Sequence, residues 1–142
     1  MTIKQISVLL DNEPGSLSRV SDLLGKEGIN IGAFSLTEAT EHTIARMVTD
    51  NPKKTIRVLK NAKYQVWEKD VIAVVVPDHP GALNAVLKPL ATAKINVNYL
   101  YPHLRKSEDN AVIIFRVGDN KKAYEVLKEN WIQVIGEELY SL

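Results

Sequence analysis

The sequence predicts an α+β fold built from two βαββαβ units in tandem, at residues 1–69 and 70–142. Two observations lead to this prediction. The dipeptide Pro14-Gly15 recurs as Pro80-Gly81, and much of its surroundings recurs at the same spacing of 66 residues. Within each copy, short runs of β-branched and apolar residues alternate with segments whose apolar residues follow a helical period. A repeat of this length indicates one supersecondary unit that is present twice.

The spacing of the repeat changes once along the chain. Ile6, Val8, Leu17 and Leu24 recur 66 positions later, whereas the segment 58–60 recurs as 126–128, a spacing of 68. We expect the two additional residues in a surface loop over residues 105–110, because such loops accept insertions that core elements do not.

In the first unit, residues 3–10 form an expected strand that stops at the turn Asp11–Gly15. The next segment is an expected helix that ends at Gly28 and has one apolar face, made of Leu17, Val20, Leu23 and Leu24. Strands over 29–36 and 43–48 then form a hairpin, a second helix begins at Pro52, and a strand over 64–67 closes the unit.

The second unit repeats this order, which is that of a ferredoxin-like fold. Its expected strands are 71–76, 95–101, 111–117 and 131–135, and its expected helices are 81–94 and 121–130. The first of these helices is expected to direct Leu83, Val86, Leu87 and Leu90 into the core. Lys94 occupies the position of Gly28, so this helix must end differently or carry backbone strain.

Composition restricts the classes of partner. Eighteen basic and seventeen acidic residues leave a formal charge of +1, which gives no overall attraction to nucleic acid or to an anionic membrane. The absence of cysteine excludes disulfides, thiolate zinc sites and cysteine nucleophiles. Neither a signal-peptide pattern nor a run of eighteen apolar residues occurs. We therefore expect a cytoplasmic protein with no nucleic-acid or membrane partner. Units of about seventy residues with open sheet edges also favour a homodimer.

A family resemblance rests on the motif that both units share. A strand leads into an acidic or amide-rich turn with Pro-Gly, then an amphipathic helix, then Ile-Asn-Ile or Ile-Asn-Val at the start of the next strand; the matching segments are 11–17, 28–31, 78–83 and 94–97. This arrangement resembles the ACT domain, and the whole chain resembles two of them in tandem. The resemblance implies sensing of a small molecule, usually an amino acid, bound where two ACT domains meet, and regulation of an enzyme or a transcription factor.

The expected ligand-binding residues surround the two turns and the starts of the second strands. They are Asp11, Asn12, Glu13, Gly15, Ser16, Leu17, Asn30 and Ile31 in the first unit, and Asp78, His79, Gly81, Ala82, Leu83, Asn96 and Val97 in the second. The helix start suits the carboxylate of an amino acid, and a glycine there permits a close approach to the backbone. The turn side chains suit the ammonium, and each asparagine, expected beside the turn, offers both a donor and an acceptor. The same residue types also suit ordinary helix caps and turns, with Asn12 or Asp78 as the cap.

Other kinds of site find less support. A small enzyme of the acylphosphatase type shares this topology, but those enzymes need an arginine in the first loop, and here that loop is acidic or neutral. We recognise no nucleophile with its base, and we expect no catalytic residue and no cofactor. His42, His79 and His103 lack the paired spacing of a metal site, so no metal is expected. Tyr99 and Tyr101 lie outside any RNA-recognition motif, and they are expected to pack on a sheet face or line a site.

The sequence therefore predicts a non-catalytic regulatory protein that binds a free amino acid at ACT-domain interfaces and modulates amino-acid metabolism. Three alternatives remain beside it. The chain could be the separate regulatory subunit of one amino-acid biosynthetic enzyme, an interaction module that has lost its ligand, or, with less support, a small ferredoxin-like enzyme of the acylphosphatase type.

Overall fold

The computed structural model describes residues 1–104 and 110–141. The chain divides into two compact units. The N-terminal unit comprises Lys4–Lys69, and the C-terminal unit comprises Asp70–Leu142 together with Met1–Ile3. Strand β4 (Val66–Pro77) begins in the first and continues into the second.

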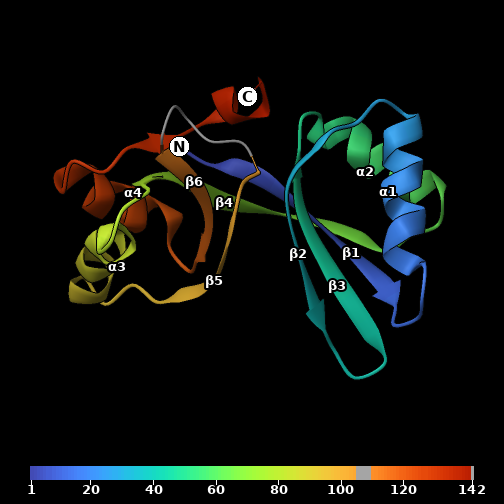
Figure 1. Ribbon diagram of the computed structural model, residues 1–142, viewed down its shortest axis with the longest axis horizontal. Helices are drawn as coiled ribbons and strands as arrows, with labels where there is room; N and C mark the ends of the chain where they lie inside the picture. Colours follow the sequence, from blue (N-terminus) through green and yellow to red (C-terminus); the bar gives the residue numbers. More distant parts are fainter. Residues whose placement is uncertain (105–109, 142) are drawn as a thin grey trace. The chain divides into compact units, whose positions relative to one another are not determined.

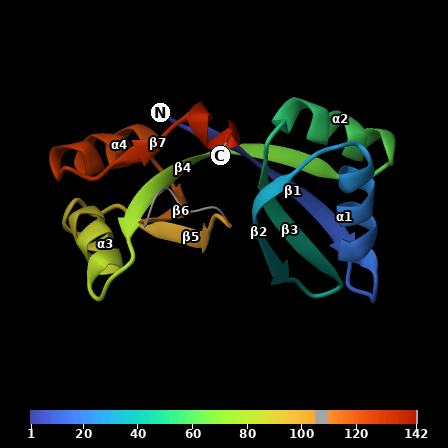
Figure 2. The ribbon, with the colours of Figure 1, turned by 45° about the horizontal axis from the view of Figure 1, so that its top comes forward.

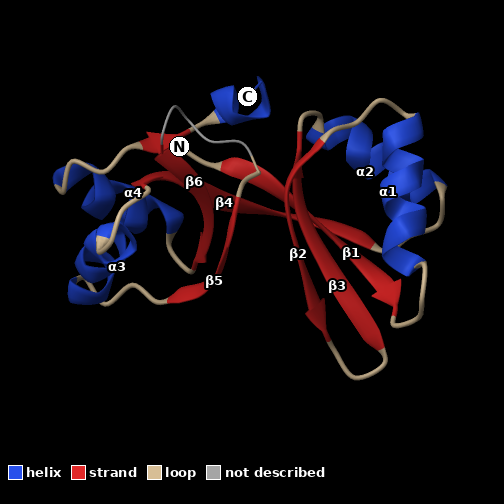
Figure 3. Ribbon diagram, viewed as in Figure 1, coloured by secondary structure: helices blue, strands red, loops and turns tan. Residues whose placement is uncertain are grey.

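The N-terminal unit has the predicted βαββαβ order. Its elements are β1 (Ile3–Asp11), α1 (Ser16–Lys26), β2 (Ile31–Glu38), β3 (His42–Thr49), α2 (Pro52–Asn61) and the beginning of β4. The strand order is β2-β3-β1-β4, and β3 runs antiparallel to both β1 and β2. Helices α1 and α2 cover the same face of this sheet (Figure 1, Figure 3). This is the ferredoxin-like arrangement expected from the sequence.

The C-terminal unit repeats this order. It contains the second part of β4, α3 (Ala82–Thr92), β5 (Val97–Pro102), β6 (Asn110–Val117), α4 (Asn120–Glu129) and β7 (Val134–Ile135). The strand order is β5-β6-β4-β7, the same as in the N-terminal unit. Helices α3 and α4 lie on the same side of these strands (Figure 2). A short 3-10 helix at Glu137–Ser141, which the sequence pattern did not reveal, buries Leu139.

Two expected strands differ in the structure. Residues 64–67 and 71–76 were expected as separate strands, but β4 is continuous, because Glu68, Lys69 and Asp70 supply neither a glycine nor a proline to end it. The strand expected over 131–135 shrinks to β7. Trp131 adopts a left-handed conformation with φ +61° and belongs to the turn that ends α4, where its N–H donates to the carbonyl of Lys128.

Each of the helices α1 to α4 is followed, two residues after its last residue, by a residue with positive φ. Gly28 has φ +73°, as expected, whereas Lys63, Lys94 and Trp131 reach +72°, +59° and +61° without being glycine. Of the two alternatives expected at Lys94, backbone strain is therefore the one that occurs.

Each unit has its own apolar core between helices and sheet. In the N-terminal unit the fully buried side chains of Val20 and Leu24 on α1 pack with Leu59 on α2 and with alternate residues of β1. The equivalent cluster of the C-terminal unit contains Val86, Leu90, Leu127 and Phe115. In the first turn of α2, the side chain of Thr55 is buried, and its Oγ1 donates to the carbonyl of Asn51, 2.8 Å away.

The strand registers define which residues of the two units correspond. In the N-terminal unit Phe34 is opposite Met47 and Leu36 is opposite Ala45. In the C-terminal unit the same positions are Leu100 opposite Phe115 and Pro102 opposite Ile113. The two additional residues therefore lie between Pro102 and Ile113, within the connection that the sequence indicated. Residues 105–109 of that predicted loop lie outside the described residues.

Candidate small-molecule site

Both Pro-Gly turns place a glycine in the left-handed region directly before a helix. Gly15 has φ +88° and Gly81 has φ +84°, so the turn geometry itself requires glycine at these positions. This glycine is the N-cap residue of each helix, and it has no side chain that could accept a hydrogen bond from the first turn. Helix geometry leaves N–H groups of the first turn without an intrahelical partner, and such groups suit an anionic ligand.

A charged network crosses the turn of the N-terminal unit. Arg19, one turn into α1, donates from Nη2 to Glu13 Oε1 at 3.0 Å and to Ser16 Oγ at 3.3 Å. His42 Nε2 lies 4.0 Å from Asp11 Oδ1. Because the Arg19 and Glu13 side chains are both more than half exposed, their pairing contributes little to stability. A charged ligand could therefore exchange with either partner at small cost.

Four of these side chains, those of Asp11, Ser16, Arg19 and His42, border a polar depression of about 430 Å³. It is lined by Leu9, Leu10, Asp11, Ser16, Arg19, His42, Ala62, Lys63, Tyr64 and Gln65. Arg19 and His42 were not predicted as neighbours of the turn. The spacing of Arg19 from Ser16, three residues along a helix, was the available signal.

The turn of the C-terminal unit lacks this network. The counterparts of Arg19 and Ser16 are Ala85 and Ala82, and Ala82 is buried in the core rather than offered to a ligand. His79, the counterpart of Glu13, has Nδ1 3.0 Å from the carbonyl oxygen of Pro80. The two turns share their backbone geometry but not their side-chain chemistry.

Asn30 and Asn96 do not lie beside the turn of their own unit, contrary to expectation. Asp11 is opposite His42 at one end of β3, whereas Ile31, next to Asn30, is opposite Thr49 at the other end. Helix α1 runs back along the sheet, so that the residues after it return to the end where β1 begins (Figure 1). The register in the C-terminal unit puts Pro77 and Val97 at opposite ends of β6 in the same way.

The starts of β2 and β5 have surroundings of their own. The backbone N–H of Asn30 donates to Asp50 Oδ1 at 3.1 Å, and the N–H of Asp50 donates to the carbonyl of Asn30 at 3.1 Å. Asn96 instead borders a depression of about 360 Å³ together with Lys94, Ile95, Asn98, Gly118, Asp119 and Lys122. The side chains of Ile31 and Val97 are half-buried beside these asparagines.

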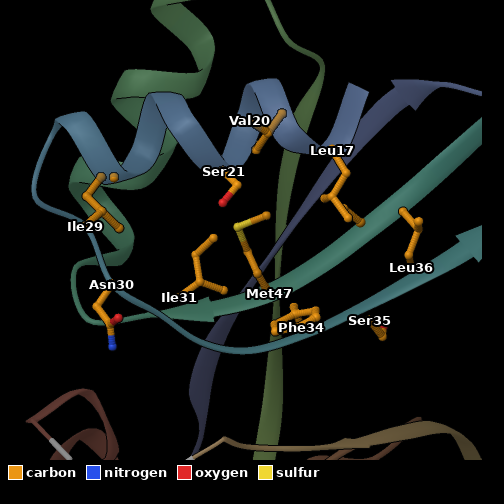
Figure 4. A pocket seen from close by; sticks show the side chains of 12 residues that line it. Leu17, Val20, Ser21, Ile29, Asn30, Ile31, Phe34, Ser35, Leu36 and Met47 are labelled. Carbon is orange, nitrogen blue, oxygen red and sulfur yellow. The ribbon is translucent and has the colours of Figure 1, made fainter. Parts of the chain in front are cut away.

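An apolar hollow of the N-terminal unit lies between α1 and the edge strand β2. It has a volume of about 400 Å³ and is lined by Leu17, Val20, Ser21, Gly25, Ile29, Asn30, Ile31, Phe34, Ser35, Leu36, Ala45 and Met47. Figure 4 shows Leu17 and Ser21 on α1 facing Met47 and Ile31 on the strands. Three expected site residues, Leu17, Asn30 and Ile31, line this hollow, and the rest of its lining was not predicted.

The rim of the hollow is apolar and exposed. Leu17 is 38% exposed, Phe34 52% and Leu36 50%, although Leu17 was expected to face the core. Leu83 in the C-terminal unit was expected inside as well and is 42% exposed. Both leucines lie at the margin of an apolar helix face that is wider than the core it covers, which explains the two wrong assignments.

Two further features bear on the kind of site. Within residues 1–104 and 110–141, no group of three or more His, Asp or Glu side chains is placed to hold a metal ion. In the same part of the chain no helix has the length and apolarity needed to cross a membrane.

Tyr99 and Tyr101 stack on each other with ring centroids 6.4 Å apart, and Tyr101 is buried, so these rings pack on a sheet face as expected.

Comparison with known proteins identifies the family. The family model described as an ACT domain pair matches residues 1–142. The chain belongs to this family. The resemblance inferred from the Pro-Gly motifs is thereby confirmed over the whole length of the ACT domain pair.

Solved structures share the fold. Protein BT0572 from Bacteroides thetaiotaomicron is 32% identical, with a TM-score of 0.92 over 100% of this chain and 98% of that one. The ligand-free regulatory subunit of aspartate kinase from Thermus thermophilus is 14% identical, with a TM-score of 0.64 over 89% and 91% of the two chains. The corresponding subunit from Thermus flavus is 12% identical, with a TM-score of 0.59 over 90% and 92%. No curated protein matches the sequence.

Proposed function

We propose that this ACT domain pair is a non-catalytic regulatory protein whose ligand is a free amino acid. The observation that carries the proposal is the pair of glycine-initiated helix starts in a chain that belongs throughout to the ACT domain pair family. Backbone N–H groups and the positive end of a helix dipole suit a carboxylate. The carboxylates of Asp11 and Glu13, beside the first helix start, suit an ammonium.

The geometry indicates how such a site is assembled. The turn and the following strand start lie at opposite ends of each unit. A single unit therefore cannot bring its own turn and its own strand start to one ligand. The exposed apolar edge formed by Leu17, Phe34 and Leu36 supports a homodimer as the functional form.

The regulated target is proposed to be an enzyme of amino-acid metabolism in the cytoplasm. The Thermus neighbours are separate regulatory subunits of aspartate kinase, and each has nearly the same extent as this chain. This likeness favours the second candidate, in which the chain is itself the regulatory subunit of one amino-acid biosynthetic enzyme. Activity of an aspartate kinase catalytic chain, measured with and without the protein, tests aspartate kinase as that enzyme, and an unchanged rate in the presence of every amino acid would exclude it as the target.

Calorimetric titration against the twenty amino acids, with a thermal-shift screen alongside, tests the main proposal. A ligand that binds only the folded chain must raise its melting temperature. Replacing Asn30 by Ala should weaken binding by about 1–3 kcal/mol, the usual consequence of an unsatisfied buried partner. The fold should persist, because the hydrogen bonds between Asn30 and Asp50 use the backbone of Asn30.

Asn61→Ala, at the exposed end of α2, is the matched control and should leave the affinity unchanged. If none of the twenty amino acids binds, the proposal fails, and the interaction module takes its place.

A further inference from the structure

The floor of the apolar hollow differs between the two units. In the N-terminal unit it is formed by Ala45 and Met47 of β3. The strand registers make Ile113 and Phe115 their counterparts in β6. Both counterparts are larger, and both pack against the core of the C-terminal unit. In the C-terminal unit these larger side chains therefore occupy the space that stays open beside Ala45 and Met47 in the N-terminal unit.

The helical wall differs in the same direction. Ser21 and Gly25 of α1 line the hollow, six and ten residues after Gly15. Six residues after Gly81, α3 has Leu87, which packs on the core of the C-terminal unit. The counterpart of Gly25 is Ala91. Four substitutions on two elements thus remove volume from the hollow in one unit only.

The rim changes in the opposite sense. Phe34 and Leu36, which stand over the hollow, correspond to Leu100 and Pro102 in the C-terminal unit. The N-terminal unit therefore has smaller side chains at the base of the hollow and larger apolar side chains around its rim. The result is a hollow of about 400 Å³, within the range of small-molecule sites.

The hollow also has a polar end. Asn30 and Ser21 are among its few polar side chains, and Figure 4 shows the Asn30 amide directed away from α1. Strand β2 stands at the end of the strand order, so it presents alternate backbone N–H and C=O groups outward. A C=O of this edge can bind an ammonium, so an amino acid whose carboxylate lies at a helix start can place its apolar group in the hollow.

Resting on the proposed function, we infer that the hollow of the N-terminal unit is the specificity pocket for an amino acid with a large apolar side chain, of leucine, isoleucine, methionine or phenylalanine type. The corresponding place in the C-terminal unit is structural, because its own side chains occupy it. Within the part of the chain that the structure describes, these differences assign the apolar pocket to the N-terminal unit although the fold is duplicated.

Titration of the full chain with each of these four amino acids, and with serine, aspartate and lysine for comparison, measures the selectivity directly. We expect the apolar group to bind at least about tenfold more tightly than the polar group, because burial of such a side chain is the source of the difference. Tighter binding of a polar amino acid would overturn the inference and leave the proposed function standing. Binding of none of the twenty would overturn both.

Filling the pocket with the residues of the other unit tests its location. Ser21→Leu and Ala45→Ile should each weaken binding of leucine by about tenfold or more. Ile113→Val, a small change at the counterpart of Ala45, is the matched control and should leave the affinity unchanged. An unchanged affinity in both filled variants would place the ligand elsewhere and refute the pocket.

Two further measurements cover the remaining outcomes. If Ala45→Ile does not fold, Ala45→Val shortens the pocket more gently and should shift the preference from phenylalanine toward valine; an unshifted preference counts against the pocket. 4-Methylpentanoate, which is leucine without its ammonium, should bind at least about tenfold more weakly than leucine. Equal affinities would overturn the assignment of an amino acid. If the filled variants alter self-association but not ligand affinity, a second copy of the chain occupies the hollow and the inference is wrong.

Discussion

The ends of α1 and α3 provide a reciprocal test of backbone strain. Gly28 and Lys94 occupy equivalent positions and both have positive φ, +73° and +59°. A left-handed conformation costs an L-residue about 1–2 kcal/mol. A Cβ added at Gly28 would meet no heavy atom within 4 Å, so the cost there arises from the backbone alone. Replacing Gly28 by Ala removes chain entropy from the unfolded state, which returns about 0.4–1 kcal/mol.

The net effect expected for Gly28→Ala is a loss of about 1 kcal/mol in the free energy of unfolding. Lys94→Gly should give a gain of about the same size, by the same reasoning in reverse. Equilibrium unfolding in urea measures both, with the midpoint changed and the slope unchanged. The melting temperature should move by about 2–4 °C in the corresponding direction.

Gly118→Ala is the control. A Cβ added at Gly118 would likewise meet no heavy atom within 4 Å, but the φ of Gly118 lies outside the left-handed region. This variant should be neutral or more stable by about 0.4–1 kcal/mol. The reasoning is refuted if Gly28→Ala is as harmless as Gly118→Ala, or if Lys94→Gly lowers stability. If the two units unfold separately, each change should appear in the transition of its own unit.

Three further changes test the core, a buried hydrogen bond and the exposed edge. Leu59→Ala, at a fully buried position in the core, should lower the free energy of unfolding by about 2–5 kcal/mol in urea, and a loss below that range would mean that the site collapses around the cavity. Thr55→Val leaves the Thr49 hydroxyl, 2.8 Å away, without its buried partner and should cost about 1–3 kcal/mol. The double variant with Thr49→Val should recover part of that loss, and purely additive losses would contradict this account. Phe34→Glu, on the exposed edge, should abolish self-association in sedimentation equilibrium with little change in stability; a parent chain that is already monomeric would contradict the proposed dimer.

Local signals predicted most of the fold. These signals depend on a few neighbouring residues each: the Pro-Gly turns, the glycine after α1 and the periodic spacing of apolar residues. The turns and the periodic spacing occur in both copies of the repeat, so each could be recognised twice. The periods were less informative about burial. They identified one apolar face on α1 and α3, but Leu17 and Leu83 lie at its margin and remain exposed. The width of the covered face depends on the sheet beneath the helix, which a single segment does not specify.

The position of Asn30 was wrong for a topological reason. Asn30 and the Pro-Gly turn are separated by one helix, and that helix returns antiparallel to the strand before it. The two motifs therefore stand at opposite ends of the sheet, as the β1–β3 and β2–β3 registers show. The βαβ order contained this information, but it becomes explicit only when the register is known.

The apolar hollow could not be predicted from residue types, because a hollow is a deficit of side-chain volume. Ala45 and Ser21 are unremarkable as single residues. Their meaning comes from Ile113 and Leu87, which occupy the same places in the other unit. The insertion in the second unit changes the spacing between corresponding residues of β3 and β6 from 66 to 68. The strand registers are therefore needed to show which residues of β3 and β6 correspond.

The same comparison separates a functional hollow from a packing defect. A packing defect lowers the free energy of unfolding and has no function, so filling it should raise the free energy of unfolding and change no other property. A binding pocket is also an unfilled space in the absence of ligand, and filling it should raise the stability of the free chain while the affinity falls. The C-terminal unit demonstrates that this fold accepts Leu87 and Ile113 at these positions. Fold requirements therefore do not explain Ser21 and Ala45, and the position of these small residues beside the exposed Phe34 and Leu36 favours a role in binding over a role in packing.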